Sequence, residues 1–320
     1  MINSHSLSAS STARLAVAAA MLAGLCAHTA QAETGKLLLT GGVSSISGAA
    51  GGGLTPWAVI GSNATAGEIG ATGYVTRTQT QDYSLNIVGA AVGIKDRVEI
   101  SLAQQDFDAS PAIALNGIAP FGVTPGQRIK MDVLGLKVKL AGDAVLDSDS
   151  WMPQISAGLE HKTVAPGSLG SVLNFLSTKT SGTDLYLNAT KLFMAQGLLV
   201  NTTLRYTNAN QNGLLGFGSG APGKDSYSLV PEVSVAYLLN KNWAIGAEYR
   251  VKPNNLEALG RAAGLGDALS EDDWKDIFVA WAPNKNLSVT LAYVDLGRIV
   301  PGVTGSRKQT GFYLSAQLAF

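Results

Sequence analysis

The chain ends in Gly311-Phe-Tyr-Leu-Ser-Ala-Gln-Leu-Ala-Phe320, and the pattern of this stretch decides the fold. Counting back from Phe320, every second residue is apolar: Leu318, Ala316, Leu314 and Phe312. The residues between them are smaller or more polar, apart from Tyr313. Because successive side chains of a strand point to opposite faces, this period of two predicts a strand with one apolar face.

A final strand of this kind resembles the closing strand of bacterial outer-membrane barrels. In those proteins the closing strand is also the recognition signal for the barrel-insertion machinery. The resemblance implies two partners for this chain, the insertion machinery and the lipids of the outer membrane.

The other end of the chain has the features of a secretory signal. Leu15–Leu25 is apolar but too short to span a bilayer as a helix. Ala30-Gln31-Ala32 matches the small-x-small pattern of a cleavage site. We therefore expect residues 1–32 to be a signal peptide that is removed after export. Residues 33–320 are then the outer-membrane barrel domain.

The composition of the predicted mature chain excludes several classes of protein. Loss of Arg14 leaves 22 Lys and Arg against 23 Asp and Glu, and no basic tract is present, which argues against a nucleic-acid partner. Cys26 lies within the signal segment, so neither disulfides nor thiolate metal sites are expected. Charged residues are only 14% of the chain and glycine is 37 of 320 residues. Low charge without a long apolar run is typical of a membrane barrel.

Alternation of apolar and polar residues recurs along the whole chain. The clearest strands are predicted at Arg97–Gln105, Met152–Lys162, Gly197–Thr207, Tyr227–Leu238, Trp243–Val251 and Leu287–Tyr293. Connections alternate between short and long when counted back from Phe320, as in barrels with short periplasmic turns and long outer loops. The count predicts an all-β, antiparallel, up-and-down transmembrane barrel of about 14 strands, with Lys36–Ile46 and Trp57–Gly61 among them. If Lys36–Gly61 instead folds inward as a plug, 12 strands remain.

Aromatic residues fall where two interfacial girdles would lie. At the periplasmic rim we expect Trp151, Phe193, Trp243, Trp281 and Phe320. At the outer rim we expect Tyr83, Phe107, Tyr206, Tyr249, Trp274 and Phe312. The long connection Lys252–Asp272 has spaced leucines that predict a short helix, either packed over the barrel mouth or acting as a gate.

Charged residues on the opposite face of the strands are candidates to line the lumen. They are Glu99, Lys137, Lys139, Glu160, Arg205, Glu232, Glu248 and Arg250. Acids and bases are mixed, so inward salt-bridge ladders are expected in preference to a two-carboxylate hydrolytic site. Neither a metal-ligand cluster nor a cofactor motif is recognisable, so no cofactor is predicted.

Catalysis would need a base, and the predicted mature chain has one histidine, His161. Strand alternation places His161 toward lipid and its neighbour Glu160 toward the lumen, so the two do not form a catalytic dyad. We therefore do not predict an enzyme.

Five stretches carry a resemblance to a known family. They are Gly35-Lys-Leu-Leu-Leu-Thr-Gly-Gly42, Gly52-Gly-Leu-Thr-Pro-Trp-Ala58, Gly142-Asp-Ala-Val145, Ala280-Trp-Ala-Pro-Asn-Lys285 and Ala292-Tyr-Val-Asp-Leu-Gly297. They are similar to an uncharacterised family of outer-membrane proteins, the domain of unknown function 3034, from about Gly35 to Phe320. The resemblance implies the barrel and its compartment, and it carries over no catalytic residue.

The function expected from these observations is a passive channel for small solutes with a mixed-charge lumen and little ion selectivity. One alternative is a surface or adhesion barrel that acts through its long outer loops. A second alternative is a lipid-modifying enzyme that uses His161 at the membrane rim.

Overall fold

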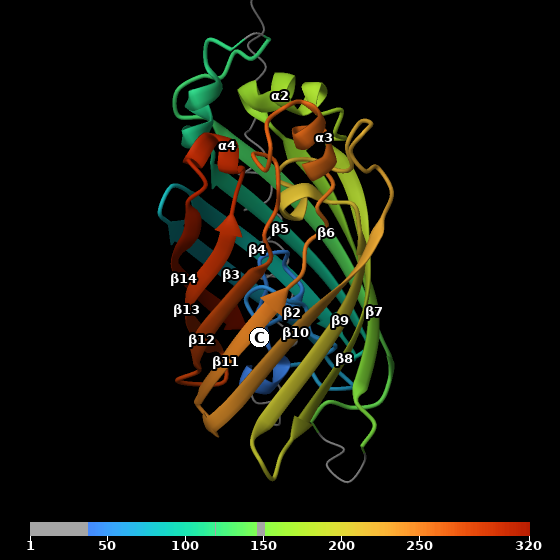
Figure 1. Ribbon diagram of the computed structural model, residues 1–320. Coiled ribbons are helices and arrows are strands. Elements are labelled where there is room, and N and C mark those ends of the chain that lie inside the picture. The colour runs from blue at the N-terminus through green and yellow to red at the C-terminus, as the bar shows by residue number, and fades with distance from the viewer. Residues whose placement is uncertain (1–37, 119, 146–150) are drawn as a thin grey trace, which may run out of the picture.

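The computed structural model describes residues 38–118, 120–145 and 151–320, which form a closed antiparallel barrel with a segment of chain inside it (Figure 1). The predicted signal peptide, residues 1–32, lies outside the described residues. Each barrel strand pairs with its neighbours in sequence. The twelve barrel strands are β3 (Ile69–Thr80), β4 (Ser84–Ile94), β5 (Val98–Asp108), β6 (Arg128–Ala141), β7 (Gln154–Ala165), β8 (Ser181–Phe193), β9 (Leu198–Thr207), β10 (Ser228–Asn240), β11 (Trp243–Arg250), β12 (Trp274–Trp281), β13 (Leu287–Arg298) and β14 (Lys308–Ala319).

The last strand closes the ring, because β14 pairs with β13 on one side and with β3 on the other. Its faces follow the alternation in the sequence. Phe312, Leu314, Leu318 and Phe320 are exposed on the outside, Ala316 is half-buried, and Tyr313 is buried inside. The pattern of this one strand therefore predicted its faces correctly.

The prediction of 14 wall strands is wrong, and the twelve-strand alternative with an inward plug is correct. Residues 38–64, here called the plug, contain the 3-10 helix η1 (Leu38–Gly41) and the two-stranded sheet of β1 (Val43–Ser44) and β2 (Ala50–Gly51). Figure 1 shows this segment in blue inside the lower half of the barrel. From position 41 to position 64 every residue is buried. Barrel walls surround the plug on all sides, so its apolar residues are buried without needing the alternation of a wall strand.

The connections differ in length at the two ends of the barrel, as the sequence predicted. The turn end carries the short connections 95–97, 194–197, 241–242 and 282–286 and the longer 142–153. The loop end carries 109–127, 166–180, 208–227, 251–273 and 299–307, with one short turn at 81–83.

Short helices cover the loop end (Figure 1). They are η2 (Ser110–Leu115), η3 (Gly167–Leu169), α2 (Gly170–Phe175), η4 (Asn210–Gly213), α3 (Glu257–Ala262) and α4 (Pro301–Thr304). The helix predicted within Lys252–Asp272 is confirmed as α3. Among the described helices, none has the length and apolar content needed to cross a bilayer.

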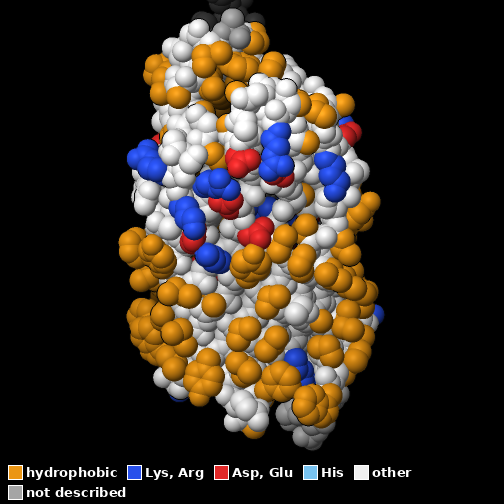
Figure 2. All heavy atoms as spheres, viewed as in Figure 1, with side chains coloured by type: hydrophobic (Ala, Val, Ile, Leu, Met, Phe, Trp, Pro, Cys, Tyr) orange, Lys and Arg blue, Asp and Glu red, His pale blue; other side chains and the backbone are white. Residues whose placement is uncertain are grey.

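Apolar side chains cover the outside of the barrel wall. On the face drawn in Figure 2 they form a broad belt across the lower half, with charged side chains gathered above it. Wide exposure of residues such as Val75, Leu204 and Ile277 in a water-facing wall would be unfavourable, whereas a lipid environment solvates them. Near the turn end, Trp243 and Trp281 stack with ring centroids 5.7 Å apart and are both exposed, as an interfacial girdle requires.

Part of the predicted outer girdle is wrong. Tyr83, Phe107 and Trp274 are 4%, 8% and 4% exposed and lie inside the barrel. The strand period contained this information, because Phe107 shares the parity of Glu99 and Trp274 shares the parity of Asp276, both of which face inward. The position of these residues near strand ends suggested a membrane interface, but the loop-end helices enclose them.

Candidate functional site

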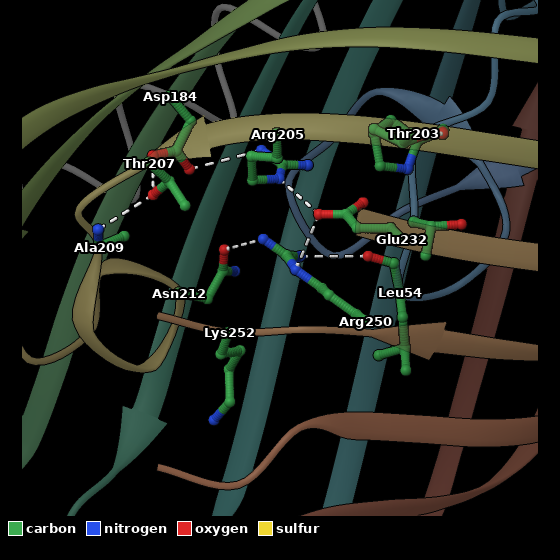
Figure 3. Close-up of polar contacts among 12 residues, drawn as sticks. Leu54, Asp184, Thr203, Arg205, Thr207, Ala209, Asn212, Glu232, Arg250 and Lys252 are labelled. Atoms are coloured by element: carbon green, nitrogen blue, oxygen red, sulfur yellow. Dashed lines mark hydrogen bonds and ion pairs between the residues drawn. The ribbon is translucent and has the colours of Figure 1, made fainter. Parts of the chain in front are cut away.

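A network of charged side chains crosses the barrel interior (Figure 3). Arg205 of β9 lies 2.9 Å from Glu160 of β7, 2.5 Å from Glu232 of β10 and 3.4 Å from Asp184 of β8. Lys162 lies 2.6 Å from Asp184 and 3.2 Å from Glu160. All five side chains are 1% exposed or less. The charges are therefore paired with each other and do not line an open aqueous pore.

The structure divides the eight candidate lumen residues into three groups. Glu160, Arg205, Glu232 and Arg250 form the central network, in which Arg250 Nε lies 3.2 Å from Glu232 Oε1. Glu99, Lys137 and Glu248 hold the plug. Lys139 lies near the turn end and pairs with Asp96 and Asp143 at 2.8 and 3.1 Å.

Sequence reasoning missed two members of the central network, Lys162 and Asp184. Lys162 lies two residues after Glu160 in the same strand, so the period of two places it on the same inward face. Asp184 is the register partner of Glu160 on the adjacent strand, which needs the strand pairing.

One side of the plug is fixed by an ion pair in the wall. Glu99 of β5 and Lys137 of β6 lie 3.2 Å apart. The Glu99 carboxylate accepts hydrogen bonds from the backbone N–H groups of Ala50 and Gly61 at 3.0 and 2.7 Å. Lys137 Nζ donates to the carbonyls of Ala50 and Trp57 at 3.0 and 3.1 Å. The wall thus satisfies plug backbone groups that would otherwise be buried without partners.

The opposite side of the plug is fixed by Glu248 and Arg250 of β11. Glu248 accepts hydrogen bonds from Leu54 N at 2.7 Å and from Thr55 Oγ1 at 2.6 Å. Arg250 donates to the carbonyl of Leu54 at 3.2 Å, a contact drawn in Figure 3. A Cβ at Gly52 would lie 2.0 Å from the Glu248 carboxylate, so glycine permits this close approach. These contacts explain why charged residues occur in the part of the wall that encloses the plug.

An apolar chamber of about 320 Å³ lies between the plug and the loop-end helices. Its lower boundary includes Ile46 and Leu54 of the plug. Its side includes the three aromatics that were predicted to form a girdle, Tyr83, Phe107 and Trp274. The sequence predicted a polar lumen, and this half of the barrel differs because its inward residues pack against apolar loop segments.

The chamber reaches the surface at the tip of the molecule. Ile118, Phe175 and Leu265 line it and are each about half exposed, at 51%, 54% and 51%. Phe175 also meets Phe121, another lining residue, edge to face with ring centroids 5.3 Å apart. Exposed apolar residues at an opening are favourable for an apolar ligand that enters there.

A small polar group adjoins the chamber near Trp274. Lys252 Nζ lies 3.5 Å from Glu271 Oε2, donates to Gln211 Oε1 at 2.6 Å and lies 4.6 Å from the centre of the Trp274 ring. Burial lowers the pKa of Lys252 to about 8 and raises the pKa of Glu271. Gln211, Glu271 and Trp274 line the chamber.

His161 lies on the outer face of β7, and its Nδ1 is 2.9 Å from Thr183 Oγ1. Glu160 points inward to Arg205, so the two neighbours do not act together. Within the described ranges, no group of three His, Cys, Asp or Glu side chains is placed to hold a metal ion.

A closed antiparallel barrel with an apolar exterior and charged residues inside is a transmembrane β-barrel of the outer-membrane type. The chain belongs to the family described as "Protein of unknown function (DUF3034)", whose model matches residues 40–317. This is the family that the sequence resembled.

Other comparisons find similar structures at low identity. The KdgM porin has a TM-score of 0.45 and 10% identity, with 78% of this chain and 99% of that chain covered. The COG4313 outer membrane channel from Pseudomonas putida F1 has a TM-score of 0.42 and 10% identity, with 81% and 96% covered. Outer membrane phospholipase A from Escherichia coli has a TM-score of 0.41 and 10% identity, with 78% and 92% covered. No curated protein matches the sequence.

Proposed function

We propose that this protein is an outer-membrane uptake barrel for small apolar solutes. The loop end faces the exterior and the turn end faces the periplasm, as in other barrels with short periplasmic turns. Solute enters the chamber at the tip, and transfer to the periplasm requires displacement of the plug. The observation that carries the proposal is the apolar chamber above the plug.

The size of the chamber sets the size of its ligand. An engineered apolar cavity of about 150 Å³ binds benzene. A chamber of about 320 Å³ therefore suits a molecule on the order of twelve non-hydrogen atoms. Its volume also lies in the range of ordinary small-molecule sites.

The position of the plug and its hydrogen bonds to the wall favour gated passage of solute over free diffusion. It lies below the chamber and is hydrogen-bonded to the wall on two sides through Glu99 and Glu248. At the turn end, Asn63 Nδ2 donates to the carbonyls of Lys285 and Ala319 at 2.7 and 3.3 Å. We therefore expect the resting protein to give little conductance in a planar bilayer.

Two partners follow from the proposed location. The apolar outer belt contacts membrane lipids, and the closing strand that ends at Phe320 is the proposed signal for the barrel-insertion machinery. No observation favours a second function, either adhesion or lipid modification.

Binding of naphthalene to protein in lipid nanodiscs tests the proposal. Ala112 lines the chamber and is 7% exposed, so Ala112→Trp fills part of the chamber. Ala262 is exposed on α3, so Ala262→Trp is the matched control. Equilibrium dialysis should show saturable binding by the wild type and Ala262→Trp, with loss in Ala112→Trp. Equal uptake by Ala112→Trp discs and wild-type discs would contradict the proposal.

A further inference from the structure

Two side chains that line the chamber, Trp274 and Glu271, each carry a buried polar atom that is not needed elsewhere in the described structure. Among the described residues, neither the Trp274 indole Nε1 nor the Glu271 Oε1 atom has a hydrogen-bond partner, and both are buried. Trp274 is 4% exposed and Glu271 is 8% exposed. A buried polar group without a partner is unfavourable, so a pair of them beside a cavity indicates a ligand that satisfies both.

The two groups lie around the same ammonium group. Lys252 Nζ contacts Glu271 Oε2 at 3.5 Å and lies 4.6 Å from the centre of the Trp274 ring. The other Glu271 oxygen, Oε1, therefore stays available while Oε2 is used by Lys252 and by the backbone N–H of Gln211 at 2.8 Å. One free donor and one free acceptor are available at this wall.

On this basis we infer that the chamber selects apolar molecules that carry one uncharged hydroxyl group. A hydroxyl both donates and accepts, so it can donate to Glu271 Oε1 and accept from Trp274 Nε1. The inference rests on the proposed function and adds the chemical class of the solute.

Local charge balance disfavours an ionic ligand. Lys252 is already paired with Glu271. In the adjoining network, Lys162, Arg205 and Arg250 face Glu160, Asp184 and Glu232. A carboxylate ligand would therefore be buried beside Glu271, and none of the described residues that line the chamber is a Lys or Arg. An unpaired buried charge is strongly unfavourable.

Three ligands with one ring system test the inference: naphthalene, 2-naphthol and 2-naphthoate at pH 7. Binding is measured by equilibrium dialysis with protein in lipid nanodiscs. Ligand uptake by Ala112→Trp discs, which carry the same lipid, is subtracted to correct for partitioning into the lipid. We expect 2-naphthol to bind about tenfold more tightly than naphthalene, in keeping with two net hydrogen bonds. We expect 2-naphthoate to bind more weakly than naphthalene.

Two variants test the Trp274 donor and the charge of Glu271 separately. Trp274→Phe keeps an aromatic ring and removes the N–H, so the advantage of 2-naphthol should fall about threefold while naphthalene binding is kept. Trp281→Phe, on the outer face, is the matched control and should change neither the affinity for 2-naphthol nor the affinity for naphthalene. Glu271→Gln removes the negative charge beside Lys252 and should strengthen 2-naphthoate binding.

The outcomes separate the inference from the proposed function. Equal affinity for naphthalene and 2-naphthol, or preference for 2-naphthoate in the wild type, would overturn the inference and leave the apolar chamber intact. Failure of all three ligands to bind would overturn the proposed function as well.

Discussion

The Glu248 carboxylate in β11 accepts a hydrogen bond of 2.7 Å from the backbone N–H of Leu54, a residue 194 positions earlier in the chain. The contact joins the barrel wall to the plug, and Leu54 is at the same time part of the chamber lining. A change that breaks this contact therefore acts both on closure of the barrel and on the lower boundary of the chamber.

Replacement of this carboxylate should loosen the plug. Glu248→Ala removes the acceptor for Leu54 N and for Thr55 Oγ1 and leaves both donors buried, at a cost of about 1–3 kcal/mol each. We expect faster amide hydrogen exchange in the plug and increased conductance in planar bilayers. Glu257→Ala, on the exposed α3, is the control. Unchanged exchange in the Glu248→Ala plug would contradict the assigned role of Glu248.

The same contact can be disturbed from the plug side. A Cβ at Gly52 would lie 2.0 Å from Glu248 Oε1, whereas a Cβ at Gly67 has open space within 4 Å. Gly52→Ala should therefore displace the Glu248 carboxylate and reproduce the conductance of Glu248→Ala, while Gly67→Ala should behave as the wild type. Planar-bilayer recordings of the two alanine variants make the comparison, and identical traces would argue against tight packing at Gly52.

The central charge network should be highly sensitive to loss of its shared base. Arg205→Met leaves Glu160, Asp184 and Glu232 with one fewer partner in a fully buried site. Breaking a buried ion pair from one side costs about 3–5 kcal/mol. The exposed pair of Lys179 and Asp225 gives the control, since Lys179→Met should cost less than about 1 kcal/mol. Urea unfolding in lipid vesicles measures the free energy of unfolding of both variants. A similar decrease in the two variants would contradict the importance of the network.

The sequence predicted the wall much better than the interior. Alternation determines the faces of a strand locally, so the barrel wall and the outward position of His161 follow from residue order. The position of the plug depends on contacts between distant segments, such as Glu99 with Gly61 and Glu248 with Leu54. No local pattern encodes those contacts, so the strand number stayed open between 14 and 12.

The chamber could be predicted only in part. The inward parity of Phe107 and Trp274 was readable from the strand period, but the cavity they line also depends on loops from other parts of the chain. Glu271 lies in such a loop, where strand parity gives no information. The polar wall beside Trp274 was therefore beyond the reach of sequence reasoning.

The stability of the loop 251–273 should depend on pH, because Asp272 in this loop is bonded to Arg298 of β13. Two hydrogen bonds from the Arg298 guanidinium, at 2.8 and 2.7 Å, hold the pKa of Asp272 down at about 2. Because the folded pKa lies below the unfolded one, this contact stabilises the loop fully above about pH 4 and is lost as the pH falls toward 2. Amide exchange of the loop, corrected for intrinsic rates, should therefore rise below pH 4. Asp272→Asn should abolish that pH dependence, and an equal rise in the variant would assign it to other groups.

Locking the plug to the wall tests the central claim most directly. A Cβ at Gly48 would lie 3.4 Å from the Ala103 Cβ, close to the spacing of a disulfide, and the only natural cysteine is Cys26 in the predicted signal segment. Gly48→Cys combined with Ala103→Cys therefore gives a plug that can be locked by oxidation and released by dithiothreitol. Any strain at Gly48, whose φ is +98°, is common to both states.

The measurement is the initial rate at which cells that express this double variant accumulate radiolabelled 2-naphthol. We predict that oxidised cells take it up no faster than cells without the protein, and that dithiothreitol restores the wild-type rate. Wild-type uptake through the oxidised, locked barrel would contradict the account, as would wild-type cells that accumulate 2-naphthol no faster than cells lacking the protein.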